Sequence, residues 1–322
     1  MKGVKIALDS GAHSLYNKFH LNKLKDKKKF YETKEFKTYL EKYIAVLHDY
    51  GEQLFMYVTL DVIHNAKATW DILKYIESCG LHPLPVFHVK SDIKWLHKLL
   101  DNYEYFCLGG IGGALHSSGN YINFGDYAFK QICDSRGYPR AKIHGLAMTG
   151  KLAARWPWYS VDSITWKYNS AVGTIVFPLY HHGEFILERV IITDRRVAQT
   201  GHYLSLPEVM RKKLDQEFEA CGYTFEQLKH SSAARGVVGA VLFNKMVEII
   251  KERWEKKLPE FEGWKLLYAG DPVTNLESCK IFTEVLAKKL VKDVILFETF
   301  WTSFIGRNTP KSVSLKKRFL GG

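Results

Sequence analysis

The stretch VKIALDSGAHS (residues 4–14) begins as an apolar run and changes at Asp9 to a polar cluster. An apolar run of this length predicts a buried β-strand. Ser10 and Gly11 after it predict a turn, for which glycine supplies the backbone freedom. Asp9 could simply cap that turn, or it could be the first residue of an active site. The ends of the later strands bear on this choice.

Five further apolar runs end as the first one does. They cover residues 54–60, 83–89, 105–110, 141–147 and 158–163, and the residues at their ends are Asp61, His88, Gly109, Gly110, His144, Gly145 and Asp162. Segments with a 3.6-residue apolar period or with helix start and stop signals, at 35–50, 69–79, 92–100 and 124–135, predict helices between the runs. The alternation of strand and helix predicts an α/β fold with a parallel sheet.

Two parallel architectures compete for this pattern. A doubly wound sheet that binds a dinucleotide needs a GxGxxG turn after its first strand, and the segment GGIGG (109–113) lacks that spacing. A (β/α)8 TIM-type barrel forms its active site at the carboxyl ends of its strands. Because six successive strands end in polar or glycine residues, the sequence favours the (β/α)8 barrel.

The second half of the chain departs from this rhythm. Residues 173–194 predict two strands around His182 and Gly183, a hairpin inserted on the rim of the barrel. Residues 207–229 predict charged helical structure, residues 232–257 a long amphipathic helix, and residues 264–272 and 293–301 two further strands. We expect one domain over residues 1–322, with the first part of the barrel and most site residues in 1–172, the hairpin insertion in 173–200, and a helical and terminal barrel part with a basic tail in 201–322.

The charge of the chain points to a polyanionic partner. Lys and Arg number 46 against 34 Asp and Glu, for a net charge of +12. A protein this basic often binds nucleic acid, although a generally basic surface without a dedicated partner gives the same total.

The cysteines and the apolar segments indicate in which cellular compartment the protein works. The five cysteines have no CxxC spacing, which favours a reduced, intracellular protein without a structural zinc cluster. The first ten residues become polar too early for a signal peptide, and the longest uncharged stretch, 105–125, is rich in Gly, Ser and Asn. We therefore expect a cytoplasmic protein.

Three carboxylates are expected to converge on the edge where the strands end. Two carboxylates facing a glycosidic carbon supply what glycosyl transfer requires, since one attacks or stabilises that carbon and the other moves a proton. A third can hold an exocyclic amine or a ring N–H of a bound base. These residues are Asp9, Asp61 and Asp162. Each could alternatively cap a turn or a helix. The glycines of 109–113 could form a tight loop or let a flat ligand approach the backbone.

Four segments, in this order, resemble the motifs of the tRNA-guanine transglycosylases. DSGAHS (9–14) resembles their DSGG(Y/F)Q segment, LGGIGG (108–113) their GGLAVGE strand end, HGLAMTG (144–150) their MGVG strand end, and VDSITW (161–166) the FDC segment that holds the nucleophile. The resemblance covers about residues 4–165. The run PWYSVDS (157–163) is most like the smaller, phage-associated branch, the DpdA group, which inserts 7-deazaguanine bases into DNA.

The resemblance implies exchange of guanine in DNA for a 7-deazaguanine such as preQ0, by double displacement and without a cofactor. Asp162 would be the nucleophile and Asp9 the general base. Asp61 would bind the Watson–Crick edge of the base. The residues expected to contact the base are Ser10, His13, Asp61, His88, Gly109, Gly110 and His144. His88 could instead be a hydrogen-bonded core histidine, and His13 an exposed turn residue.

Basic and aromatic residues are the candidates for holding the nucleic acid, whose target base would be flipped out of the helix. The phosphate-binding candidates are Lys23, Lys25, Lys27, Lys28, Lys29, Arg155, Lys167, Arg195 and Arg196. Trp156, Trp158 and Trp166 could stack on bases or pack in the core.

The family's zinc-binding CxCxxC pattern is missing after the nucleophile segment, where only Cys221 and Cys279 follow. We therefore expect no metal of that type. The absence of that pattern favours DNA over tRNA as the substrate, and the protein would work in the host cytoplasm if a phage encodes it. A tRNA-directed transglycosylase, a non-catalytic nucleic-acid-binding relative, and a plain glycoside hydrolase or nucleosidase remain as alternatives.

Overall fold

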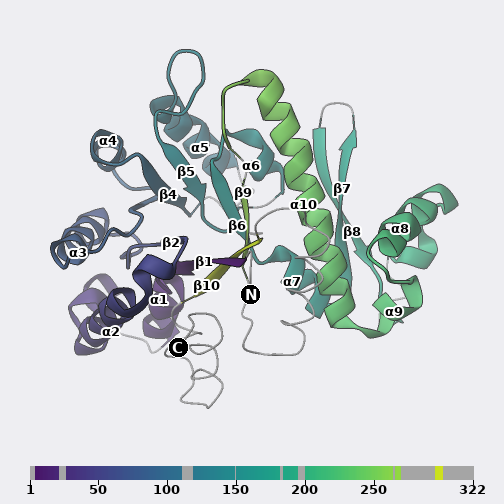
Figure 1. Ribbon diagram of the computed structural model, residues 1–322, viewed down its shortest axis with the longest axis horizontal. Coiled ribbons are helices and arrows are strands. Elements are labelled where there is room, and N and C mark those ends of the chain that lie inside the picture. Colours follow the sequence, from purple (N-terminus) through teal and green to yellow (C-terminus); the bar gives the residue numbers. More distant parts are fainter. Residues whose placement is uncertain are drawn as a thin grey trace.

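The computed structural model describes residues 4–21, 27–110, 119–148, 150–181, 184–194, 200–263, 265–269 and 294–299. Its centre is an eight-stranded parallel sheet with the order β2-β1-β10-β9-β6-β5-β4-β3 (Figure 1). The strands are β1 (Val4–Asp9), β2 (Met56–Tyr57), β3 (Val86–His88), β4 (Tyr105–Gly109), β5 (Lys142–Gly145), β6 (Ser160–Ser163), β9 (Lys265–Ala269) and β10 (Val294–Thr299). The predicted α/β class and parallel sheet are confirmed, including the two strands expected near the end of the chain.

The two outermost strands of that order are also connected to each other. Val58, directly after β2, forms a parallel bridge with Leu84, shortly before β3. The Thr59 N–H donates to the Leu84 carbonyl at 2.9 Å, and the Leu84 N–H donates to the Tyr57 carbonyl at 2.7 Å. The segments around β2 and β3 are therefore hydrogen-bonded, although they stand at opposite ends of the strand order.

Helices follow the strands, as the apolar periodicity predicts. They are α1 (Ala12–Leu21), α2 (Lys34–Tyr50), α3 (Ala66–Ser78), α4 (Ile93–Asn102), α5 (Gly119–Ile132), α6 (Gly150–Arg155) and α7 (Thr165–Ala171), with short 3-10 turns at Lys27–Glu32 and Gly51–Gln53. Side chains cap three of these helices: Thr33 accepts from the Phe36 N–H, Asn65 from Ala68 and Asp92 from Lys94. The N-cap expected at Asp92 is thus confirmed, whereas the pattern did not predict α1, α6 or α7.

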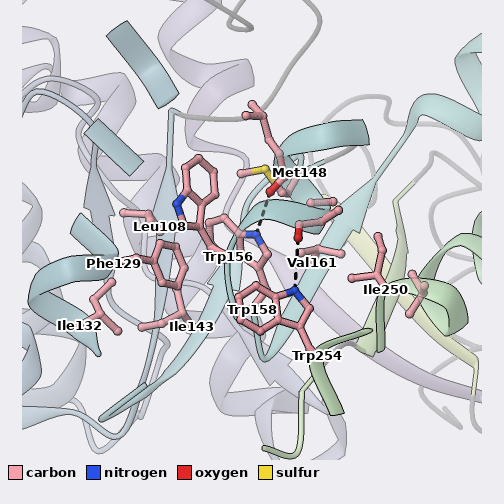
Figure 2. Close-up of a cluster of buried hydrophobic side chains, with 14 of the residues drawn as sticks. Leu108, Phe129, Ile132, Ile143, Met148, Trp156, Trp158, Val161, Ile250 and Trp254 are labelled. Atoms are coloured by element: carbon pink, nitrogen blue, oxygen red, sulfur yellow. Dashed lines mark hydrogen bonds between the residues drawn. The ribbon is translucent and has the colours of Figure 1, made fainter. Parts of the chain in front are cut away.

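The largest hydrophobic cluster packs helices against the sheet (Figure 2). Trp156, Trp158 and Trp254 lie in it with Phe129, whose ring stacks on Trp156 at a centroid distance of 5.6 Å. Trp156 is 4% exposed and Trp158 is fully buried. Both side chains therefore belong to the core, and the suggestion that they stack on nucleic-acid bases is wrong. Trp166 is half-buried and lies against α10 (Ser232–Lys257).

A second body of structure lies on the far side of α10 from the sheet (Figure 1). The predicted hairpin forms from β7 (Thr174–His181) and β8 (Glu184–Ile191), which pair antiparallel, and it packs against α7 and α10. It is followed by a 3-10 turn (Tyr203–Ser205), α8 (Glu208–Ala220) and α9 (Phe225–His230). These two helices divide the predicted helical region 207–229, because Gly222 takes a φ of 80° and Thr224 opens α9 with a capping box.

Among the described residues, no helix is both long and apolar enough to cross a membrane. Cys107 and Cys221 are buried thiols, and Cys79 and Cys133 are half-buried thiols. Cys279 lies outside the described residues.

Candidate active site

Five of the strand ends singled out in the sequence lie at one edge of the sheet. Asp9 is the last residue of β1, His88 of β3 and Gly109 of β4, while Asp162 lies near the end of β6 and Asp61 in the segment after β2. Because the strands are parallel, their carboxyl ends meet at the same edge. Electrostatic and hydrogen-bonding contacts link several of these side chains.

Asp9 is a carboxylate with a strongly raised pKa. Its pKa is raised to about 7, first because burial penalises the charged form, and then because the negative charges of Asp61 and Asp162 lie close by. The Gly11 N–H donates to Asp9 Oδ2 at 3.3 Å and opposes this shift. A carboxyl group with a pKa near 7 can both accept and release a proton at neutral pH.

Asp61 and His88 form a close pair. The distance from His88 Nε2 to Asp61 Oδ2 is 2.5 Å, and the two side chains are 14% and 6% exposed. The histidine ring lies directly against the backbone of Gly109, where a β-carbon would come within 3.0 Å of its Cε1 and Nδ1 atoms. A larger residue at 109 would press on the ring that sits beside Asp61, which gives this glycine a steric reason that the sequence pattern alone does not supply.

Asp162 is held at one of its oxygens. The Ala147 N–H donates to Asp162 Oδ1 at 2.7 Å, and His144 Nε2 lies 3.4 Å from the same oxygen. Ala147 adopts a φ of 53°, a left-handed conformation that is unusual for alanine and that aims its N–H at the carboxylate. With Oδ1 engaged in this way, Oδ2 is the oxygen left for another partner.

A buried polar chain continues from Asp162 into the sheet. His144 Nδ1 is 2.7 Å from Ser160 Oγ, which is itself 2.7 Å from Tyr105 Oη. The strand register explains the contacts, since His144 pairs with Ser160 on one side and with Cys107 on the other. Burial and the charges of the three carboxylates raise the pKa of the Cys107 thiol, which places this side chain close to Asp9, Asp61 and Asp162.

Ser10 is enclosed by helix α2. Its carbonyl accepts a hydrogen bond of 2.7 Å from Tyr39 Oη, and Tyr43 Oη donates to the Val58 carbonyl at 2.5 Å. Burial, together with the charge of Asp9, raises the pKa of both tyrosines. The Ser10 hydroxyl is fully buried and has no hydrogen-bond partner among the described residues. A buried hydroxyl in this state is available to a ligand, and its predicted role in base binding stays a prediction.

The remaining base-binding candidates fall in different surroundings. His13 is exposed on α1 and lies 3.3 Å from the Asn17 amide. Gly110 is exposed with a φ of 82°, beyond the end of β4. His144 has no exposed surface. Its burial behind Asp162 favours a role in support of that carboxylate over direct contact with a base.

The phosphate-binding candidates are described only in part. Arg155 already forms a two-pronged pair with Asp126, at 2.8 and 2.6 Å, and this pair lowers the pKa of Asp126. Its charge is thus matched within the protein, which argues against a phosphate contact. Lys167 is half-buried on α7, and Lys27, Lys28 and Lys29 belong to a 3-10 turn whose side chains are not described. Lys23, Lys25, Arg195 and Arg196 lie outside the described residues.

Sequence reasoning missed several residues of this site: Tyr39, Tyr105, Ser160, Cys107 and Ala147. One signal was present, because residues two apart in a strand face the same side. Ser160 shares a face with Asp162, and Tyr105 shares one with Cys107. The contacts between these pairs depend on the register of β4, β5 and β6, which no local pattern determines.

The site combines two carboxyl groups in contrasting surroundings. Asp162 accepts a hydrogen bond from the Ala147 N–H on one oxygen, while Asp9 has a pKa near 7, and this is the division of labour that nucleophilic and acid–base chemistry needs. Across the part of the chain that the structure describes, no group of three or more His, Cys, Asp or Glu side chains is arranged to hold a metal ion. Compared with protein-family models, curated proteins and solved structures, the chain matches none of them.

Proposed function

We propose that this protein is a DNA-guanine transglycosylase, which exchanges guanine in DNA for a 7-deazaguanine base through a covalent bond to Asp162. The observation that carries the proposal is the pairing of an oriented carboxylate, Asp162, with a carboxyl group of pKa about 7, Asp9, at one edge of a parallel sheet. The ordered resemblance of four sequence segments to the guanine transglycosylases supplies the reaction type.

The proposal includes a closed (β/α)8 barrel. The strand order of the parallel sheet, read as a ring, is β1-β2-β3-β4-β5-β6-β9-β10, which is the order of the strands along the chain. The bridge between Val58 and Leu84 supplies the contact between β2 and β3 that such a ring needs. In a barrel of this kind, the carboxyl ends of all eight strands surround one site.

The first displacement uses Asp162 as the nucleophile. Oδ2 attacks C1′ of a deoxyguanosine in DNA, the bond from C1′ to N9 breaks, and the electron pair of that bond leaves with guanine. Protonated Asp9 gives its proton to the departing base. A group with a pKa near 7 holds that proton in a substantial fraction of molecules at neutral pH. The product is an ester between Asp162 and the sugar.

The second displacement reverses the roles. The 7-deazaguanine replaces guanine in the pocket, and Asp9, now ionised, accepts the proton from its N9. The freed electron pair of N9 attacks C1′, and Asp162 leaves as a carboxylate. Protons and electron pairs balance over the two steps, since Asp9 gives one proton and takes one back.

Base recognition is assigned to the pair Asp61 and His88. An acceptor on Asp61 and the imidazole of His88 present complementary groups to the edge of a purine-like base, and the Ser10 hydroxyl adds a further buried partner. Gly109 leaves room for the His88 ring beside the backbone of β4 and so keeps that ring next to Asp61. The partners are thus double-stranded DNA with the target base flipped out, drawn by a net charge of +12, and a free 7-deazaguanine base such as preQ0.

The exchange reaction is tested with preQ0 and either duplex DNA or tRNA, followed by digestion to nucleosides and mass spectrometry. We expect the 7-deazaguanine deoxynucleoside in DNA with the wild-type protein. Its loss is expected in Asp162→Asn, and its retention in Asp71→Asn, a matched control at an exposed aspartate of α3 that pairs with Lys67. Product in tRNA alone would overturn the DNA assignment, and no product in either nucleic acid would overturn the reaction.

A further inference from the structure

The buried chain of Tyr105, Ser160 and His144 ends on the proposed nucleophile. His144 lies on β5 between β4 and β6 and is fully buried. One ring nitrogen, Nδ1, contacts Ser160 Oγ at 2.7 Å, and the other, Nε2, lies 3.4 Å from Asp162 Oδ1. The ring therefore bridges a hydroxyl and a carboxylate, and each contact constrains where its proton sits.

The carboxylate determines which ring nitrogen carries hydrogen. A lone pair on Nε2 facing a carboxylate oxygen would be repelled, so Nε2 must be the protonated nitrogen. In the neutral ring Nδ1 is then an acceptor, and Ser160 donates its hydroxyl hydrogen to it. Tyr105 Oη in turn can donate to Ser160 Oγ at 2.7 Å, so that the hydrogen bonds from Tyr105 through Ser160 to His144 Nδ1 run in one direction.

We propose that His144, held by Ser160 and Tyr105, is a positioning residue. Its Nε2 edge lies 3.4 Å from Asp162 Oδ1, without the geometry of a hydrogen bond, and attracts that oxygen so that Oδ2 faces the sugar. Its effect on the reaction rests on the proposed function, whereas the contact itself does not. The Ala147 N–H donates to the same oxygen, so the backbone and the ring together set the orientation of the carboxylate plane.

The other titratable groups around this ring are few among the described residues. On β4, Cys107 pairs with His144 in the sheet, and Tyr105 reaches it through Ser160. On β6, Asp162 is the acidic neighbour, and the charge of Asp162 also reaches Asp9 at the end of β1. The thiol and phenol are neutral at pH 7, because burial raises the pKa of both.

The contact is tested without any reaction by nitrogen NMR of the histidine side chains in the full-length protein. We expect the His144 ring at neutral pH to carry hydrogen on Nε2, and its nitrogen signals to shift in Asp162→Asn but not in Asp71→Asn. His144→Gln identifies the signals of this ring. Hydrogen on Nδ1 alone, or His144 signals unchanged in Asp162→Asn, would overturn the proposal whether or not the protein exchanges bases.

The consequence for the reaction is tested by kinetics. His144→Ala is expected to lower kcat by about 100-fold with little change in KM for either substrate, since a misaligned nucleophile binds but does not attack. His144→Gln keeps an N–H at the position of Nε2 and should restore part of that loss. Ser160→Ala should lower kcat by a smaller factor, and His48→Ala, at an exposed histidine of α2, should leave it unchanged.

Equal losses in His144→Ala and His144→Gln, or a rise in KM in place of a fall in kcat, would contradict the positioning role. Circular dichroism and thermal melting of each variant identify losses that come from unfolding. If no variant and no wild-type protein exchanges bases, the proposed function fails, while the NMR measurement still decides the contact between His144 and Asp162.

Discussion

The surroundings of Asp9 work against its charge. Burial removes water from it, and the charges of Asp61 and Asp162 repel a third negative charge. The buried charge lowers the stability of the folded protein, although a neutral residue could occupy the same position. Residues that reduce stability in this way are commonly found at functional sites, where the perturbed group is the one that reacts.

The stability of the protein should therefore depend on pH through Asp9. Its pKa is 3.8 as an unperturbed group and about 7 in the folded protein, so between these pH values the folded state binds more protons than the unfolded state. Stability from this residue is complete below about pH 4 and is lost as pH rises to about 7. Asp9→Asn does not titrate, so its free energy of unfolding should exceed that of the wild type by on the order of 4 kcal/mol at pH 8.

Urea denaturation of both proteins at pH 4, 6 and 8 measures this difference. The gap between Asp9→Asn and the wild type should widen steadily up to pH 7 and then level off. A constant gap over the whole range would show that the pKa of Asp9 is not raised in the folded protein. The Asp71→Asn variant serves as the reference, because Asp71 is an exposed carboxylate.

At the scale of single residues, the sequence predicted the chemistry of the site better than its contacts. The ends of successive strands identified Asp9, Asp61, His88 and Asp162 because each follows an apolar run. The support of Asp162 by His144 was not predictable, since it requires β5 to pair with β6 in one register and Ala147 to adopt a positive φ. Register and unusual backbone conformations arise from the whole sheet and leave no local pattern.

Among the helices, α2 has a structural role that its amphipathic pattern conceals. Tyr39 and Tyr43 read as apolar positions of its buried face, and their rings do pack in the core. Their hydroxyl groups also anchor the ends of two strands, through the carbonyls of Ser10 and Val58. The helix thereby holds the segments that carry Asp9 and Asp61 at fixed positions relative to each other.

Removing one of these hydroxyl groups should weaken the fold measurably. Tyr43→Phe leaves the Val58 carbonyl, in a fully buried residue, without its side-chain donor, and should lower the free energy of unfolding by about 1–3 kcal/mol. Tyr75→Phe on α3, where the side chain is 52% exposed, is the matched control and should change stability by less than about 0.5 kcal/mol. Equal urea midpoints for the two variants would contradict the anchoring role of α2.

The elements with the strongest periodicity were also the best predicted. The long helix expected at 232–257 is α10 with those bounds, and the helix expected at 35–50 is α2 starting one residue earlier. The strand expected at 54–60 shrinks to Met56–Tyr57 with an isolated bridge at Val58. The apolar run predicted correctly that these residues are buried, but it did not predict how many of them pair in the sheet.

At the scale of the whole molecule, two hydrophobic bodies share α10. One face of this helix packs on the tryptophan-rich cluster beside the sheet, and its other face packs on the hairpin and α8. A helix that is apolar on two sides explains why its periodicity is long and unbroken from Ser232 to Lys257. The hairpin body is thereby joined to the sheet that carries the site.

The net charge of +12 is a property of the whole sequence, and it does not identify which side chains would contact phosphate. Arg155, the phosphate candidate with a described side-chain partner, is paired with Asp126. A basic total favours approach to DNA at long range, while the reaction depends on the few buried groups around Asp162. The decisive step of the proposed reaction is therefore the bond between Asp162 and the sugar.

That bond is tested most directly by isolating the protein–DNA adduct. The protein is incubated with a guanine-containing DNA duplex without preQ0, denatured, digested with nuclease and with trypsin at neutral pH, and analysed by mass spectrometry. Residues 156–167, between Arg155 and the cleavage site after Lys167, contain Asp162 as their one carboxylate side chain. We expect this peptide to carry a deoxyribose-phosphate group attached at Asp162, and to lack it in Asp162→Asn. An unmodified peptide in wild-type protein that exchanges bases, or an adduct at another residue, would contradict the account.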